Sequence, residues 1–283
     1  MFEITRKASL AEGIYRISVL APHIASRRKA GHFVLVIARD GGERIPLTIV
    51  ASDNAAGTID LVYQVVGRST SELAALGEGE RIPHVAGPLG SATNVQRVGH
   101  VVVVGGGVGL AAALPIAVAM KEAGNSLTSI VGGRSKQFVI LEDDFRKASD
   151  RVIVTTDDGS YGKKGFVTDA LKELLAAGEK IDEVVAVGPL PMMRAVAETT
   201  RPAGIKTVVS LNPIMVDGTG MCGGCRVTVG GKTLFACVDG PEFDGHQVDF
   251  RELADRLATY KEMERESYQR LRDAHKCKLE GAS

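Results

Sequence analysis

Residues 101–112 read Val-Val-Val-Val-Gly-Gly-Gly-Val-Gly-Leu-Ala-Ala, an apolar run that ends in a cluster of glycines. Such a run of valines is typical of a strand buried on both faces of a parallel sheet. From Gly107 the pattern is G-x-G-x-x-A, in which glycines let the backbone approach a pyrophosphate and a helix N-terminus offers free N–H groups. The stretch therefore predicts a strand, a turn at Gly107 and Gly109 and a helix from Leu110 that border a nucleotide site. The alternative is a tight crossover without a ligand.

The segment that follows alternates apolar runs with helical patterns. The runs lie at 127–131, 152–155, 184–187 and 207–211, and the helical patterns lie at 110–122, 166–176 and 191–199. This alternation predicts a doubly wound parallel sheet, whose ligands bind at the carboxyl ends of the strands. Asp157 and Asp158 follow the third strand, and Gly188 and Pro189 follow the fourth, so all four are candidate nucleotide contacts. A solvated turn is the alternative for the two aspartates.

The second strand of a dinucleotide fold usually ends near an acidic residue that binds the ribose hydroxyls. This chain has Gly132-Gly133-Arg134 there instead. The position therefore leaves the choice between NAD and NADP open.

The first third of the chain has a different period. In residues 15–19 and 59–65 apolar side chains alternate with polar ones, as half-buried antiparallel strands require. An all-β barrel or sandwich follows. Its one clear helical segment is 70–76. Ser69-Thr70-Ser71-Glu72, at the start of this segment, has the spacing of a capping box.

Two short segments of this N-terminal β-rich region suit an anionic ligand. Arg44-Ile45-Pro46-Leu47-Thr48 places a guanidinium and a hydroxyl four residues apart at the start of a strand, a pair that suits a phosphate and a flavin edge. Gly67-Arg68-Ser69-Thr70 adds hydroxyls at a helix N-terminus. The alternatives are a surface arginine and an ordinary helix cap.

Three of the four cysteines, Cys222, Cys225 and Cys237, lie in a glycine-rich segment. With Asp217 they form the pattern D-x4-C-x2-C-x11-C, which is the plant-type iron–sulfur spacing with aspartate in place of the first cysteine. The alternative is a closed zinc site whose fourth ligand is Asp217 or Cys277.

Composition narrows the class of protein. Lys plus Arg and Asp plus Glu each number 34 in 283 residues, and only 5% of residues are aromatic, so nucleic acid is not an expected partner. Residues 101–120 carry no charge, but their glycines and Pro115 favour a strand, turn and helix over a membrane span. The N-terminus lacks the apolar run of a signal peptide, so we expect a cytoplasmic protein. No Ser-His-Asp or paired-carboxylate motif stands out, and no catalytic residue is assigned.

The expected architecture has three parts. A β barrel over 1–97 precedes an α/β nucleotide domain over 98–211. A cysteine-bearing loop region and a charged, helical tail occupy 212–283.

This order of parts resembles the ferredoxin–NADP reductase superfamily. The resemblance covers essentially the whole chain and is strongest to the small subunits of NADH-dependent reduced ferredoxin:NADP oxidoreductases. They are related to the β subunit of sulfide dehydrogenase and the electron-transfer subunit of dihydroorotate dehydrogenase B. The segments that carry the resemblance are 44–48, 105–109, 156–162, Gly188-Pro189, 215–225 and 235–246.

The resemblance implies a flavin-dependent NAD(P)H oxidoreductase. Arg44, Thr48 and Thr70 would hold FAD, Gly107 and Gly109 would border the NAD(H) site, and Asp217, Cys222, Cys225 and Cys237 would ligate a [2Fe–2S] cluster. Hydride would pass between NAD(H) and FAD, and single electrons would pass through the cluster to or from a larger flavin and iron–sulfur subunit. Ferredoxin would react with that subunit, so electron bifurcation would belong to the heterodimer. Superfamily members often have cysteine before the Gly-Pro turn, where this chain has Val187.

Other readings remain open. The chain resembles the electron-transfer subunits of sulfide dehydrogenase and of dihydroorotate dehydrogenase B, although the dihydroorotate relatives use four cysteines. A free-standing diaphorase would need no partner, and a zinc-containing assembly subunit would carry no flavin.

Overall fold

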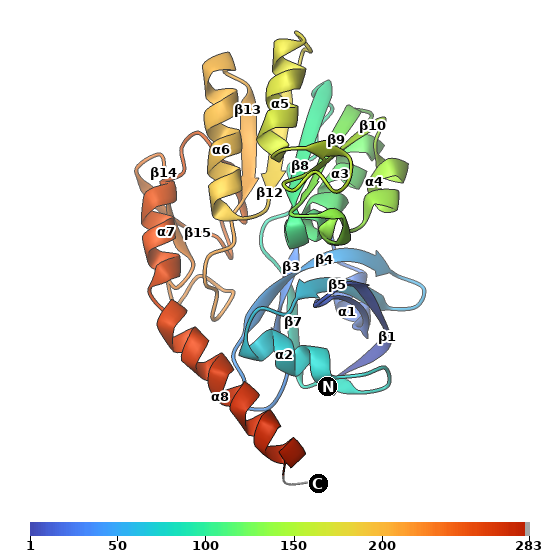
Figure 1. Cartoon of the computed structure of the whole chain (residues 1–283), viewed down its shortest axis with the longest axis vertical. Helices are drawn as coiled ribbons and strands as arrows, with labels where there is room; N and C mark the ends of the chain where they lie inside the picture. The colour runs from blue at the N-terminus through green and yellow to red at the C-terminus, as the bar shows by residue number, and fades with distance from the viewer. Residues whose placement is uncertain (281–283) are drawn as a thin grey trace.

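The computed structural model describes residues 1–280, with side chains described through residue 273, so the side chain of Cys277 lies outside the described part. The N-terminal third forms an antiparallel barrel, and an α/β unit stands on one end of it (Figure 1). The C-terminal segment returns along one side of both, and its last helix runs past the barrel. The three kinds of structure follow the order predicted from the sequence.

The barrel contains seven strands in the order β6-β1-β2-β5-β4-β3-β7, with antiparallel pairing throughout. Alternate side chains such as Ile17, Val19, Ile59 and Leu61 are fully buried, which confirms the period of two. The elements are β1 (Phe2–Ala11), β2 (Ile14–Leu20), α1 (Pro22–Ala25), β3 (Phe33–Ile37), β4 (Ile45–Asp53), β5 (Thr58–Gln64), α2 (Arg68–Ala75), β6 (Arg81–Ile82) and β7 (His84–Leu89).

Helix α2 begins two residues earlier than predicted, and its cap differs. Gly67 is the N-cap, and the Thr70 hydroxyl accepts hydrogen bonds from the amides of Val66 and Gly67 at 3.0 and 3.1 Å. Glu72 does not complete the predicted capping box, because its carboxylate pairs with Arg39 and Arg68. The one-turn helix α1 was not predicted, since four residues are too few to show a helical period.

The second sheet has the order β11-β10-β9-β8-β12-β13-β16, and its first six strands are parallel. The chain moves outward from β8 to β10, crosses back to β12 and continues to β13, so the order reverses between β8 and β12. This confirms the doubly wound sheet. The elements are β8 (His100–Gly106), η1 (Gly107–Gly109), α3 (Leu110–Glu122), β9 (Ser126–Gly133), η2 (Lys136–Phe138), α4 (Glu142–Ala148), β10 (Arg151–Thr156), β11 (Lys163–Lys164), α5 (Val167–Ala176), β12 (Glu183–Val187), α6 (Leu190–Thr200), η3 (Arg201–Ala203) and β13 (Lys206–Ser210).

The C-terminal segment is more regular than predicted. β14 (Arg226–Val229) and β15 (Lys232–Phe235) form a hairpin, and β16 (Glu242–Asp244) joins the second sheet antiparallel to β13. These strands of three or four residues are too short to show a period among so many glycines. The predicted helical tail divides into α7 (Phe250–Ala258) and α8 (Lys261–Glu280), and α8 contacts α2 of the barrel.

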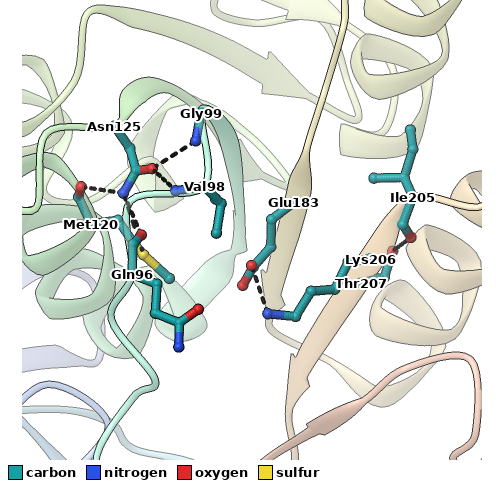
Figure 2. Close-up of polar contacts among 9 residues, drawn as sticks. All are labelled: Gln96, Val98, Gly99, Met120, Asn125, Glu183, Ile205, Lys206 and Thr207. Atoms are coloured by element: carbon teal, nitrogen blue, oxygen red, sulfur yellow. Dashed lines mark hydrogen bonds and ion pairs between the residues drawn. The ribbon is translucent and has the colours of Figure 1, made fainter.

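Asn125 fixes the chain where it passes from the barrel to the second sheet (Figure 2). Its side-chain oxygen accepts from the amides of Val98 and Gly99 at 2.8 and 3.1 Å, and its nitrogen donates to the carbonyls of Gln96 and Met120. The residue is 2% exposed, so these bonds satisfy a buried polar group. Across the sheet, Lys206 pairs with the buried Glu183 at 2.8 Å (Figure 2).

Membrane insertion of a helix has no support in the described residues. Within 1–280 no helix is both long enough and apolar enough to cross a bilayer.

Candidate functional site

The point where strand order reverses is built for close backbone approach. A Cβ on Gly109 would lie 2.6 Å from the Val187 carbonyl oxygen and 2.7 Å from Gly188 Cα. Gly107 has a φ of +56°, which favours glycine, and Pro189 caps helix α6. The predicted nucleotide residues of β8 and β12 therefore meet at the crevice where doubly wound folds bind their ligands.

Asp157 and Asp158 lie at the same edge, next to the end of β9. Their amides donate to the carbonyls of Gly133 and Arg134 at 3.1 and 3.2 Å. Hydrogen bonds from the Ser160 side chain and backbone lower the pKa of Asp158. Both carboxylates are exposed, so they are available to a polar ligand.

Tyr161 follows these aspartates in the same loop. The Tyr161 hydroxyl donates to Glu142 at 3.1 Å, and Lys136 Nζ lies 5.3 Å from the centre of its ring. The loop 157–162 was singled out, but only the fold brings Lys136 to Tyr161.

The predicted anion-binding residues of the barrel lie on β4 and at the start of α2. Arg44 is exposed just before β4, whereas Pro46, Leu47 and Thr48 are half-buried. Ser69, 9% exposed in the first turn of α2, donates to the Glu43 carboxylate at 3.4 Å. This contact brings the two predicted segments together at one end of the barrel.

Strand β4 lies between the two other candidate sites. On one side its neighbour β5 contacts the η1 turn of Gly107 and Gly109. On the other side Leu35 of β3 pairs with Pro46 of β4, and a Cβ on Gly218, next to Asp217, would lie 3.0 Å from the Leu35 side chain. Residues 49–53 of β4 pair with β5, which contacts the nucleotide turn, and residues 45–48 pair with β3, which lies against the cysteine loop.

Two of the predicted metal ligands meet in the interior. The Sγ atoms of Cys225 and Cys237 are 3.1 Å apart, and the residues are 2% and 1% exposed. The Cys237 amide also donates to Cys225 Sγ at 3.4 Å. Burial, and then the neighbouring Cys225 thiol, raise the pKa of Cys237 to about 12.

The other two predicted ligands lie on the outer part of the loop. Cys222 is exposed, and its amide donates to Asp217 Oδ2 at 2.6 Å. The Thr219 amide donates to Asp217 Oδ1 at 2.9 Å and is the main cause that lowers the pKa of Asp217. Among the described residues, no three Cys, His, Asp or Glu side chains are gathered closely enough to hold a metal ion.

The loop nevertheless fits an iron–sulfur centre in its chemistry. Three thiols are the ligands that iron–sulfur clusters use, and an ionised carboxylate supplies a fourth anionic donor. Gly218, Gly220 and Gly223 all have positive φ, so the loop adopts at three positions a backbone conformation that favours glycine. The Gly224 amide already donates to Cys222 Sγ at 3.4 Å, a contact typical of the shell around such clusters.

The segment after Cys237 is tied to the linker that follows the barrel. The Ser91 amide donates to the Gly240 carbonyl at 2.7 Å, and the Thr93 hydroxyl donates to the Glu242 carboxylate at 2.6 Å. Burial raises the pKa of Glu242. These residues were not predicted from the sequence, because no motif links positions 149 residues apart.

Comparison with known proteins assigns the family. Residues 212–249 match a family model described as the iron–sulfur cluster binding domain of dihydroorotate dehydrogenase B. A Thermotoga maritima homologue of the electron transfer subunit of dihydroorotate dehydrogenase B (NAD(+)) is 47% identical over 95% of this chain and 94% of its own length. A probable electron transfer subunit of the same enzyme from Methanopyrus kandleri is 36% identical over 79% of this chain and 82% of its own length.

Solved structures agree. A chain from the NADH-dependent reduced ferredoxin–NADP oxidoreductase structure is 46% identical, with a TM-score of 0.90 over 96% of this chain and 98% of that chain. The ferredoxin reductase of carbazole 1,9a-dioxygenase, at 20% identity and a TM-score of 0.61 over 72% of this chain and 65% of its own, shares the fold. The predicted resemblance is confirmed, and with it the flavin- and nicotinamide-binding reductase fold and the iron–sulfur domain. The chain belongs to the family of dihydroorotate dehydrogenase B electron transfer subunits and their homologues, which are flavin oxidoreductases of the ferredoxin–NADP reductase fold.

Proposed function

We propose that this chain moves a hydride between NAD(H) and FAD, and single electrons through a [2Fe–2S] cluster to or from a larger partner subunit. The observation that carries the proposal is the position of β4, which pairs with β5 beside the nucleotide turn and with β3 beside the cysteine loop. A bound flavin exchanges two electrons with the nicotinamide and one at a time with the cluster. The order of the three sites matches that chemistry.

The barrel residues would bind and orient the flavin. Arg44 is exposed and ion-pairs with no described residue, so its guanidinium is available to a phosphate. Pro46, Leu47 and Thr48 would border the ring system, with the Thr48 hydroxyl as a hydrogen-bonding group. Gly67, Ser69 and Thr70 begin α2, whose first turn offers amide N–H groups to an anion.

The second sheet would hold the nicotinamide nucleotide. Gly107, whose Cβ position is open, would leave room for the pyrophosphate, and Gly109 lets the turn approach the Val187 carbonyl at the end of β12. Gly188 and Pro189 would border the nicotinamide, and Asp157 and Asp158 would bind hydroxyls at the far end. Arg134 follows the end of β9, where an arginine can bind the 2′-phosphate of NADP(H). The proposal therefore includes NADP(H) as well as NAD(H) as a ligand.

The cysteine loop would hold the cluster through Asp217, Cys222, Cys225 and Cys237. Asp217 in the first ligand position favours the ferredoxin-linked oxidoreductases over the four-cysteine dihydroorotate relatives. The same reading divides the chain at 1–97, 98–211 and 212–283. A larger flavin and iron–sulfur subunit would complete a heterodimer, and ferredoxin would react with that subunit.

The first test is the cofactor content of the anaerobically purified chain. We expect about two irons and two acid-labile sulfides per chain with one FAD, because the proposal assigns one [2Fe–2S] centre and one flavin. Zinc without sulfide or flavin would overturn the redox function. Affinity purification from the native host tests the partner, and a chain that reduces dyes from NADH yet recovers no larger subunit would be a free-standing diaphorase.

A further inference from the structure

Two arginines from different elements hold the short loop between Cys222 and Cys225. Arg226 Nη1, at the start of β14, donates to the Gly223 carbonyl at 3.1 Å. Arg256 Nη2, in the last turn of α7, donates to the next carbonyl, that of Gly224, at 3.1 Å. The two guanidinium groups thus hold the carbonyls of both glycines that lie between the two cysteines.

Holding these carbonyls also orients the amides. In a planar trans peptide the C=O and the following N–H point in opposite directions. The Gly223 carbonyl points to Arg226, so the Gly224 amide points the other way and donates to Cys222 Sγ at 3.4 Å. By the same geometry Arg256 holds the Cys225 amide pointing away from its own guanidinium.

The charge of the two arginines is not neutralised nearby. Neither Arg226 nor Arg256 forms an ion pair with another residue in 1–273, whereas many other arginines of the chain do. Arg256 is half-buried, which limits the screening of its charge by water and salt. Two positive charges therefore lie against a loop whose proposed ligands are three thiolates and one carboxylate.

We propose that Arg226 and Arg256 are positioning residues that raise the reduction potential of the cluster held by this loop. The inference rests on the proposed function. The anionic ligands outweigh the positive charge of an iron–sulfur core, and reduction adds one more negative charge, so nearby cations stabilise the reduced state more than the oxidised state. Hydrogen bonds to the sulfur atoms act in the same direction, and the two arginines supply both effects.

The test is an EPR-monitored redox titration of the anaerobically purified full chain and its variants. R226Q and R256Q each shift the midpoint potential to more negative values. In the double variant R226Q/R256Q the equilibrium constant for one-electron reduction falls about tenfold or more. A tenfold fall corresponds to a midpoint potential about 59 mV more negative. R226K/R256K keeps both charges and stays nearer to the parent than the glutamine pair does. R251Q/K232Q removes two exposed charges of α7 and β15, whereas the hydrogen bonds to the loop carbonyls come from Arg226 and Arg256. This control pair leaves the potential unchanged.

The inference fails if the glutamine pair titrates like the parent, or if the control pair shifts as far. It also fails if the lysine pair shifts as far as the glutamine pair, because the charge would then contribute nothing. If the double variant assembles no cluster, R226Q and R256Q decide the question singly by the same criterion. A parent chain with zinc and no sulfide overturns the proposed function. A parent chain that holds a cluster whose midpoint potential the glutamine variants do not shift overturns only this inference.

Discussion

The Sγ atoms of Cys225 and Cys237 lie 3.1 Å apart inside the protein, although eleven residues, which include a hairpin, separate them in the sequence. The hairpin β14–β15 returns the chain and brings the second thiol to the first. This buried pair is the inner side of the proposed cluster site, and the exposed Cys222 and the half-buried Asp217 form its outer side.

Replacing one buried thiol should remove the cluster. We expect Cys225→Ser to lose nearly all iron and acid-labile sulfide, because a serine hydroxyl is a poor ligand for an iron–sulfur centre. Cys277→Ser is the matched control and should keep the parent content. Iron and sulfide assays on both proteins decide this, and loss of metal from Cys277→Ser would favour the zinc alternative.

Asp217→Cys should shift the midpoint potential of the cluster. A carboxylate oxygen is a harder ligand than a thiolate, so the two ligands stabilise the iron oxidation states differently. The substitution also removes the acceptors of the Thr219 and Cys222 amides, so cluster content must be measured beside the potential. An unchanged potential in a fully loaded variant would count against Asp217 as a ligand.

Arg44→Ala should weaken FAD binding. A hydrogen bond to a charged group contributes about 1.5–3 kcal/mol, so its loss predicts about tenfold to hundredfold weaker affinity. Arg81→Ala is the control, because it removes an exposed barrel arginine whose Nη2 lies 3.7 Å from Glu3 Oε2. This variant should bind FAD like the parent. Flavin fluorescence titration of the flavin-free chains gives both dissociation constants, and equal affinities would remove Arg44 from the site.

Gly109→Ala should close the nucleotide crevice. The added Cβ would lie 2.6 Å from the Val187 carbonyl oxygen, and the displaced turn should bind NADH at least about tenfold more weakly, or 1.4 kcal/mol. Gly77→Ala is the control, because the nearest atom to its Cβ would be a Glu80 side-chain oxygen at 3.4 Å. Calorimetric titration with NADH measures the difference, and parental affinity in Gly109→Ala would place the pyrophosphate elsewhere.

Glu242→Gln should change how stability depends on pH. Burial raises the folded-state pKa of Glu242, so the unfolded chain ionises first as pH rises. The stabilising contribution of the protonated carboxyl is therefore complete below its ordinary pKa and is lost as pH rises through the folded-state pKa. Urea unfolding across this pH window should show that the free energy of unfolding declines less with rising pH in the variant than in the parent. Parallel plots of this free energy against pH for the two proteins would contradict the expectation.

Local sequence patterns determined the elements and much of the chemistry. The apolar runs and glycines predicted β8, η1 and α3, and the period of two predicted β2 and β5, because these patterns repeat within a few residues. The cysteine spacing predicted the region that the iron–sulfur domain model matches. Short strands such as β16 and the cap of α2 were not predicted, since three residues show no period and several hydroxyls compete for one cap.

Only the tertiary structure decided how the sites are arranged. The position of β4 between β5 and β3 follows from strand order, which the strands themselves do not encode locally. The bond from Thr93 to Glu242 and the approach of Arg256 to Gly224 join segments 149 and 32 residues apart. Such contacts depend on how whole elements pack, and packing is a property of the folded chain that no local spacing contains.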